Sequence, residues 1–123
     1  MARVLLVDDD DQVRMMLSES LRLEGYEVEE AVNGREAVEL YRKHTPDLVI
    51  MDIIMPERDG VEAMHVLRKE FPEARVIAIS GGSANISGDY LLGTAEALGA
   101  VKAFAKPVDM GELLAVVAEL VSG

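Results

Sequence analysis

The sequence predicts an α/β domain in which a five-stranded parallel sheet is covered by helices on both faces. Three observations lead to this prediction. Short apolar runs of strand length alternate along the chain with longer segments whose apolar residues recur at helical spacing. Acidic or amide residues stand at the start of most helical segments, and Gly or Pro follows most of them. Because strands that alternate with helices pair in parallel, the chain is expected to form a (βα)5 fold.

The five expected strands are short segments rich in apolar residues. The first, third and fourth are nearly continuous apolar runs, which is typical of strands buried on both faces. The second alternates apolar and polar residues, as a strand nearer the sheet edge does. The expected strands are residues 3–7, 26–31, 47–52, 75–80 and 101–105.

The five expected helices are indicated by apolar residues three or four positions apart and by capping residues. Asp10 or Asp11 is expected to cap the first helix. Three later segments begin with the spacing of a capping box, an Asn or Asp followed three residues later by Glu, at Asn33, Asp59 and Asp109. The expected helices are about residues 12–24, 33–43, 59–71, 89–98 and 109–120.

Composition excludes several classes of function. The chain has 23 acidic and 12 basic residues and a net charge of −11, which argues against nucleic acid or an anionic membrane as partner. The absence of cysteine excludes disulfides, Cys-ligated zinc and thiol catalysis. No apolar run approaches the ~20 residues that span a bilayer, and the N-terminus lacks the features of a signal peptide. A cytoplasmic protein is therefore expected.

Polar side chains follow four of the five expected strands. Asp8 and Asp9 come directly after the first strand, and Asp52 ends the third. Ser80 ends the fourth strand, and Lys106 follows the fifth. Ligands of parallel α/β sheets bind beyond the carboxyl ends of the strands, which all meet at one edge. The sequence therefore predicts a pocket of three carboxylates, one hydroxyl and one ammonium.

The chemistry of this pocket favours a metal ion and a phosphoryl group. Two carboxylates 4 Å apart repel by ~4 kcal/mol at an effective dielectric constant of about 20, and a hard divalent cation removes this cost. Mg²⁺ is favoured over Zn²⁺ because it prefers carboxylates, waters and phosphate oxygens. A carboxylate beside Mg²⁺ can act as nucleophile and form an aspartyl phosphate. Lys106 would then neutralise phosphoryl oxygens, and Ser80 would donate a hydrogen bond to one of them.

Four segments resemble the receiver domain of two-component response regulators, in its single-domain, chemotaxis-regulator-like form. They are "VLLVDDDDQVRMML", "PDLVIMDIIMPERDG", "VIAISG" and "LGAVKAFAKPVD". The similarity covers essentially the whole chain, and the ordered set DD, D-x-x-M-P-x-x-D-G, S and KP is highly specific. The resemblance implies the flavodoxin-like strand order 2-1-3-4-5. It also implies a single receiver domain over residues 1–123, either a stand-alone receiver or one excised from a longer chain.

The resemblance assigns the metal ligands. It implies that Asp9 and Asp52 bind Mg²⁺ directly, together with the backbone carbonyl of Ile54. Asp8 is expected to assist through a metal-bound water.

The resemblance also assigns the phosphoryl chemistry and the partners. It implies that Asp52 is the phosphoacceptor and takes the phosphoryl group from a sensor histidine kinase or a histidine phosphotransfer protein. Ser80 is then the switch hydroxyl, Lys106 pairs with the phosphoryl group, and the Lys106–Pro107 bond is cis. Such a protein catalyses only its own phosphorylation and dephosphorylation, which shift a two-state equilibrium and change binding to a protein target. A homodimer is compatible with this interpretation.

Several features depart from the family pattern, and two of them concern the switch and the loop beside the pocket. The aromatic residue usually found three positions before the lysine is Ala103 here, and strand alternation places the next residue, Phe104, on the other side of the sheet. The usual coupled aromatic switch is therefore in doubt. The segment from residue 80 to residue 99 is a few residues longer than is typical of the family, which predicts a mobile loop beside the pocket.

Three other interpretations fit part of the sequence. A phosphatase of the haloacid-dehalogenase type also forms an aspartyl phosphate, but it needs a second aspartate two residues after the nucleophile, where this chain has Ile54. A flavodoxin-like electron carrier would need a hydroxyl- and amide-rich loop after the first strand, where this chain has four acids. A receiver that binds partners independently of phosphorylation is left open by Ala103.

Overall fold

The computed structural model describes residues 2–53, 59–80, 93 and 96–122. Five parallel strands form one sheet in the order β2-β1-β3-β4-β5, which confirms the predicted sheet and strand order. Each strand ends at its predicted residue, and four of the five begin one residue later than predicted. The strands are β1 (Arg3–Val7), β2 (Glu27–Ala31), β3 (Leu48–Asp52), β4 (Val76–Ser80) and β5 (Lys102–Ala105).

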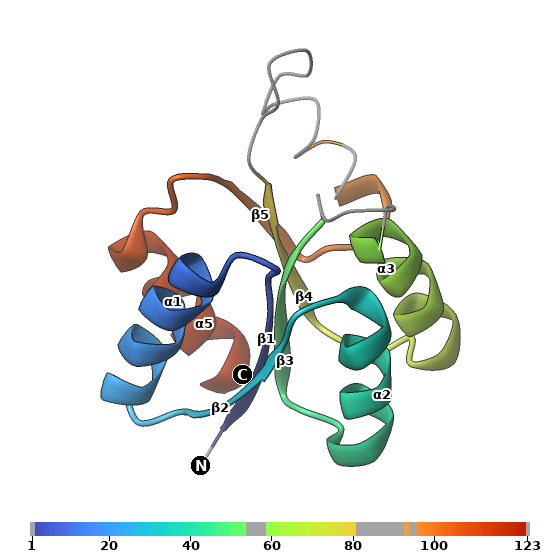
Figure 1. The fold of residues 1–123 in the computed structure, drawn as a ribbon, viewed down its shortest axis with the longest axis horizontal. Helices are drawn as coiled ribbons and strands as arrows, with labels where there is room; N and C mark the ends of the chain where they lie inside the picture. The colour runs from blue at the N-terminus through green and yellow to red at the C-terminus, as the bar shows by residue number, and fades with distance from the viewer. Residues whose placement is uncertain (1, 54–58, 81–92, 94–95, 123) are drawn as a thin grey trace.

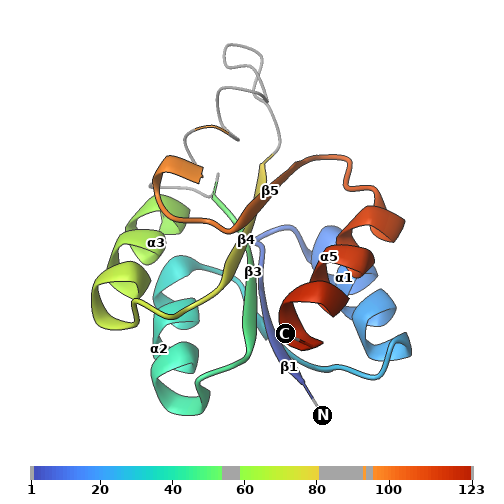
Figure 2. The same ribbon diagram turned by 180° about the vertical axis from the view of Figure 1, so that it is seen from behind.

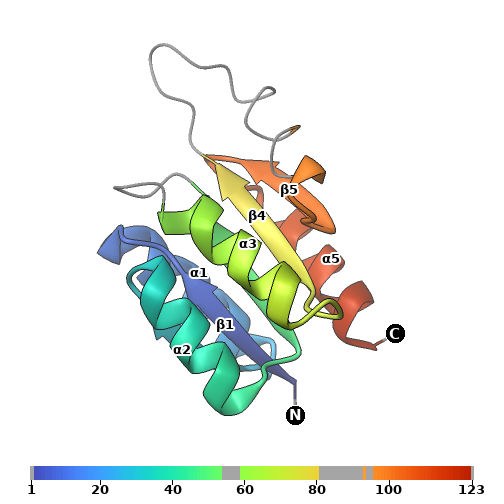
Figure 3. The same cartoon turned by 90° about the vertical axis from the view of Figure 1, so that its right-hand side faces the viewer.

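Helices cover both faces of the sheet. Figures 1 and 2 show α1 and α5 on one face and α2 and α3 on the other. Seen from the side in Figure 3, α2 and α3 lie in front of the sheet and α5 lies behind it. Most of the helix expected at residues 89–98 lies outside the described residues, and so does most of the loop expected to be mobile. The described helices are α1 (Asp11–Leu23), α2 (Gly34–His44), α3 (Asp59–Glu70) and α5 (Met110–Ser122).

The helix starts show how local sequence sets the boundaries. The Asp10 carboxylate caps α1 by accepting hydrogen bonds from the backbone nitrogens of Gln12 and Val13, at 2.9 and 3.2 Å. Asn33 caps α2 in the same way. The structure describes α3 from Asp59 onward, at the predicted start, and the cap expected at Asp59 stays a prediction because the preceding residues lie outside the described part of the chain.

Two apolar layers enclose the sheet, and alternate residues of each strand enter opposite layers. In β1, Leu6 packs toward α1 and α5 and Val7 packs toward α2 and α3. Phe104 lies in the α1/α5 layer and Ala103 packs against the other, so the predicted separation of these two side chains is confirmed. No helix among the described residues combines the length and apolar character needed to cross a membrane.

Candidate functional site

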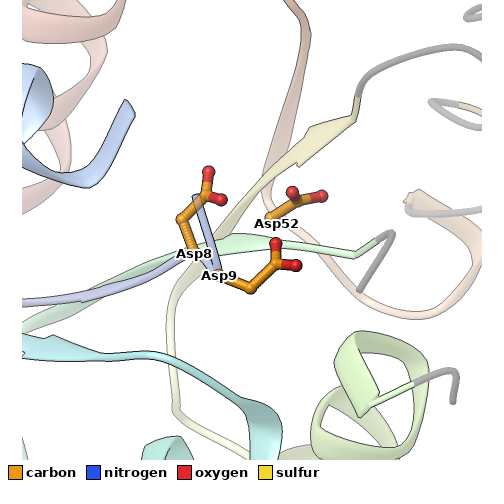
Figure 4. A group of neighbouring side chains, drawn as sticks. All are labelled: Asp8, Asp9 and Asp52. Carbon is orange, nitrogen blue, oxygen red and sulfur yellow. The ribbon is translucent and has the colours of Figure 1, made fainter. Parts of the chain in front are cut away.

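Three carboxylates gather at the carboxyl ends of β1 and β3 (Figure 4). Asp8, Asp9 and Asp52 each place one oxygen within 4.8 Å of the oxygens of the other two. Asp8 and Asp52 are buried, at 0% and 3% exposure, whereas Asp9 is exposed. Because β1 and β3 are neighbours in the sheet, their ends bring together acids that are more than forty residues apart in the sequence.

Lys106 is the residue that directly follows β5, and its side chain reaches into this cluster. Its Nζ lies 2.9 Å from Oδ2 of Asp52 and 3.1 Å from Oδ2 of Asp8. Burial lowers the pKa of this ammonium, but the hydrogen bond to Asp52 and the charges of Asp52 and Asp8 outweigh that effect, so the pKa of Lys106 is raised. The ammonium is therefore held in its charged form. The Lys106–Pro107 peptide bond is cis, as the family resemblance implied.

Ser80 ends the strand that lies between β3 and β5. Its side chain is fully buried, and its hydroxyl has no hydrogen-bond partner within the described part of the chain. Its carbonyl accepts a hydrogen bond from the backbone nitrogen of Lys106 at 2.9 Å, which ties the ends of β4 and β5 together. A buried polar group left unpaired costs about 1–3 kcal/mol.

The backbone of the site is packed closely against α3. A Cβ added at Gly60 would lie 2.5 Å from the Cα of Ile53 and 2.6 Å from the carbonyl oxygen of Asp52. Only glycine lets the first turn of α3 approach the end of β3 this closely. The second residue of the D-G pair in the sequence therefore fixes the backbone that carries Asp52.

Asp8 is held by several neighbours besides Lys106. Its backbone nitrogen donates to the carbonyl of Ala31 at 3.2 Å, and its Oδ1 accepts from the backbone nitrogen of Asp10 at 2.9 Å. Its carbonyl oxygen accepts from Nη1 of Arg14 at 2.8 Å. The strand-end position of Asp8 is therefore bonded through its main chain as well as its side chain.

Arg14 was not singled out from the sequence, although a signal was present. Arg14, Ser18 and Arg22 recur every four residues on α1, which places them on one side of the helix. All three contact Glu30, which lies on the edge strand β2. A polar stripe at helical spacing, opposite an acid in an edge strand, would have identified this network.

The donor set fits a hard divalent cation. The three carboxylates carry more negative charge than Lys106 offsets, and carboxylate oxygens are the ligands that Mg²⁺ prefers. Asp8, Asp9 and Asp52 are the described residues that could hold it. Ile54, whose backbone carbonyl the family resemblance makes a ligand, lies outside the described residues.

Comparison with known proteins shows what the chain resembles. Residues 4–118 match the model of the response regulator receiver domain. The chain is 51% identical over 79 residues to chemotaxis protein CheY of Thermotoga maritima, a stretch covering 63% of this chain and 66% of CheY. It is 43% identical over 113 residues to transcriptional regulatory protein PdtaR of Mycobacterium tuberculosis, covering 91% of this chain and 53% of PdtaR. The chain thus spans less than two thirds of the length of either relative.

The fold comparison agrees with the sequence comparison. The receiver domain of Francisella response regulator 1452 superposes with a TM-score of 0.87 at 26% identity, covering 99% of this chain and 98% of that one. The likeness extends over the whole sheet, including the strand ends that carry the acidic cluster.

Proposed function

The chain belongs to the response regulator receiver domain family of two-component signalling, and we propose that Asp52 is its phosphoacceptor. The observation that best supports this role is the environment of the Asp52 carboxylate. It is buried, lies 2.9 Å from the Lys106 ammonium, and has Asp8 and Asp9 as acidic neighbours. The donor would be a phosphohistidine of a sensor histidine kinase or of a histidine phosphotransfer protein.

The proposed transfer follows from the positions of these groups. A carboxylate oxygen of Asp52 attacks phosphorus, the new P–O bond forms, and the P–N bond to the donor imidazole breaks. The bonding electron pair returns to the imidazole nitrogen, and the product is an acyl phosphate. The three non-bridging oxygens carry negative charge throughout, so catalysis requires positioning and charge neutralisation. Lys106 supplies a cation for one oxygen, and the Ser80 hydroxyl donates a hydrogen bond to another.

We infer that the divalent cation of this reaction is Mg²⁺. Asp9 and Asp52 would bind it directly with the backbone carbonyl of Ile54, and Asp8 would assist through a bound water. When bound, the ion neutralises charge between the nucleophile and the phosphoryl group. Asp8 would also keep Lys106 oriented, because the ammonium already contacts both buried acids.

Phosphorylation would then shift a two-state equilibrium and alter binding to a downstream protein. We propose that residues 1–123 act as a single receiver domain in the cytoplasm, with no other substrate, and a homodimer is compatible with this proposal. A module that ignored phosphorylation is not favoured, since it would not need a buried Lys106–Asp52 pair or an unpartnered Ser80 hydroxyl. The phosphatase and electron-carrier interpretations are set aside because the chain belongs to the receiver family.

Intact-mass measurement after incubation with Mg²⁺ and acetyl phosphate tests the proposal. The wild type is expected to gain one phosphoryl group, and Asp52→Asn is expected to gain none. Asp47→Asn is the matched control, because Asp47 is exposed and precedes β3 at the end opposite Asp52, outside the cluster. It should be labelled like the wild type. An unmodified wild type, or equal labelling of Asp52→Asn, would contradict the proposal.

A further inference from the structure

Arg14 connects three parts of the molecule through its guanidinium group. Nη1 donates to the carbonyl oxygen of Asp8 at 2.8 Å, Nε contacts Oε1 of Glu30 at 3.1 Å, and Nη2 contacts Oδ1 of Asp11 at 2.6 Å. Only 14% of the Arg14 side chain is exposed, although it lies on a surface helix. All three guanidinium nitrogens are therefore committed, and the group is fixed between the edge strand β2 and the end of β1.

Within the part of the sheet that the structure describes, the Asp8 carbonyl that Arg14 binds has no backbone hydrogen-bond partner. Pairing between β1 and β2 ends at Val7 and Ala31, and the chain after β2 turns away into α2. The backbone nitrogen of Asp8 still bonds to Ala31, but a ladder partner for its carbonyl is lacking beyond that point. The Arg14 side chain, which comes from α1, therefore donates the hydrogen bond that a further residue of β2 would otherwise donate to this carbonyl.

This carbonyl belongs to the peptide unit that joins Asp8 to Asp9. The Asp8 carboxylate is held independently, by the backbone nitrogen of Asp10 and by Lys106. The Asp9 carboxylate makes no hydrogen bond or ion pair within the described part of the chain. The direction of the Asp9 carboxylate therefore depends on the Asp9 backbone. The plane of the Asp8–Asp9 peptide is fixed by the hydrogen bond from Arg14.

We propose that Arg14 is a positioning residue for the acidic cluster, which fixes the Asp8–Asp9 peptide and thereby aims Asp9 at the divalent cation. This inference rests on the proposed function, because it assigns Arg14 a task in the same site. Residues that orient metal ligands typically change metal affinity by about 10- to 100-fold when they are replaced. Removing the guanidinium should therefore weaken Mg²⁺ binding even though Arg14 does not touch the ion.

Calorimetric titration of the unphosphorylated protein with Mg²⁺ is the primary test. Arg14→Met is expected to weaken Mg²⁺ binding by roughly tenfold or more. Arg14→Lys should fall between this variant and the wild type, because an ammonium keeps the charge but not the forked geometry. Arg22→Met is the matched control, since Arg22 lies on the same helix and also contacts Glu30 but does not reach Asp8. Its Mg²⁺ affinity should stay within about twofold of the wild type.

Two further readouts separate positioning from folding. In Arg14→Met, the Mg²⁺ concentration for half-maximal labelling by acetyl phosphate should rise while the rate at saturating Mg²⁺ is largely kept. In metal-free protein, the Asp9 amide, which shares the peptide unit with the Asp8 carbonyl, should show a lower ¹⁵N order parameter. If Arg14→Met does not fold, Arg14→Lys is expected to show the same shifts with smaller amplitude.

The outcomes distinguish this inference from the proposed function. A wild type that is labelled normally, together with equal Mg²⁺ affinities for Arg14→Met and Arg22→Met, would overturn the role of Arg14 alone. A lower saturating rate with an unchanged Mg²⁺ requirement would overturn it as well. A wild type that neither binds Mg²⁺ nor accepts a phosphoryl group would overturn both proposals.

Discussion

The β1 side and the β4 side of the acidic pocket differ in how completely their polar groups are bonded. On the β1 side, the nitrogen, the carbonyl and Oδ1 of Asp8 are hydrogen-bonded, and its Oδ2 has no hydrogen bond among the described residues but lies 3.1 Å from the Lys106 ammonium. On the β4 side, the carbonyl of Ser80 is bonded, but its buried hydroxyl has no hydrogen-bond partner among the described residues. One side of the pocket is therefore organised before any ligand arrives, and the other retains an unused donor.

Charge explains why the two sides differ. A buried carboxylate such as Asp8 needs a counter-charge and hydrogen bonds in the free protein, because an unpaired buried ion is very costly. A neutral hydroxyl can remain unpaired for about 1–3 kcal/mol. The free protein can therefore tolerate a Ser80 hydroxyl without a hydrogen-bond partner among the described residues, and an incoming phosphoryl oxygen would accept its hydrogen bond.

The largest expected effect on stability comes from replacing Gly60. Its backbone packs closely against the end of β3, the strand that lies between β1 and β4. Gly60→Ala should lower the free energy of unfolding by about 2–3 kcal/mol, because the new Cβ would overlap the backbone of Ile53 and Asp52. The displaced strand should also disturb both sides of the pocket and reduce labelling of Asp52. Urea denaturation and intact-mass analysis measure the two effects.

Gly111→Ala is the control for this substitution. Gly111 lies in the first turn of α5 and is exposed, and a Cβ added there would lie 3.4 Å from Oδ1 of Asp109, which is an ordinary van der Waals contact. The same change should stabilise the protein by about 0.5 kcal/mol through helix propensity. Equal effects at both glycines would contradict the packing explanation.

Lys106→Met removes the cation that pairs with Asp8 and Asp52. The variant should lose about 2 kcal/mol of stability without divalent cation, less than for a fully buried pair because Lys106 is 23% exposed. Mg²⁺ should stabilise this variant more than the wild type, since it can replace the missing positive charge. Thermal unfolding with EDTA and with Mg²⁺ compares the two proteins, and an equal Mg²⁺ effect in both would argue against this explanation.

Because the pKa of Lys106 is raised, the difference in stability between the wild type and Lys106→Met should depend on pH. In the unfolded chain a lysine has a pKa of about 10.4, so the contribution of the ion pairs is complete below that pH. It is lost as the pH rises through the higher folded value. The stability difference between wild type and Lys106→Met should therefore shrink at alkaline pH. The two proteins are compared with each other because burial also raises the pKa of Tyr41, and the effect of Tyr41 on stability at alkaline pH is the same in both.

Ser80→Ala should have the smallest effect on stability and tests the unused donor directly. Removing a buried hydroxyl without a partner should leave the unfolding free energy unchanged or raise it by up to about 1 kcal/mol. Phosphorylation should nevertheless slow by at least about tenfold, because one donor to the phosphoryl oxygens is lost. Urea denaturation and the rate of labelling by acetyl phosphate measure the two quantities.

Ser18→Ala is the matched control for the unused donor. Ser18 is also buried, but its hydroxyl has a partner, Oε2 of Glu30 at 3.4 Å. This variant should lose stability and keep its phosphorylation rate. If both serine variants were destabilised equally, Ser80 could not be described as an unused donor in the free protein.

The sequence was sufficient to bring most of the pocket together. Strand alternation places Asp8, Asp52, Ser80 and Lys106 after strands that must all end at one sheet edge, and no side-chain detail is needed for that inference. The sequence narrowed the N-cap of α1 to Asp10 or Asp11, and the structure shows that it is Asp10. The strand order, by contrast, is not encoded locally and came only from the family resemblance.

The contact of Arg14 with the Asp8 carbonyl could not be predicted, although the polar stripe on α1 indicates a network with Glu30. Arg14 reaches the Asp8 carbonyl only because α1 packs beside β2, so that Glu30 holds the guanidinium in place. A flexible side chain has several rotamers, and the choice among them is made by tertiary neighbours. The unpartnered state of the Ser80 hydroxyl is likewise a property of packing, not of the residue type.

The four consecutive aspartates after β1 are chemically identical, but each has a different environment. Asp8 is buried beside Lys106, Asp9 is exposed at the cluster, Asp10 caps α1, and Asp11 pairs with Arg14. Deleting Asp8, for example, would keep an acidic run and nearly the same composition, yet each of the three remaining acids would move to its predecessor's position. Anyone who redesigns or grafts this segment must therefore preserve its spacing, because the number of acids alone does not define it.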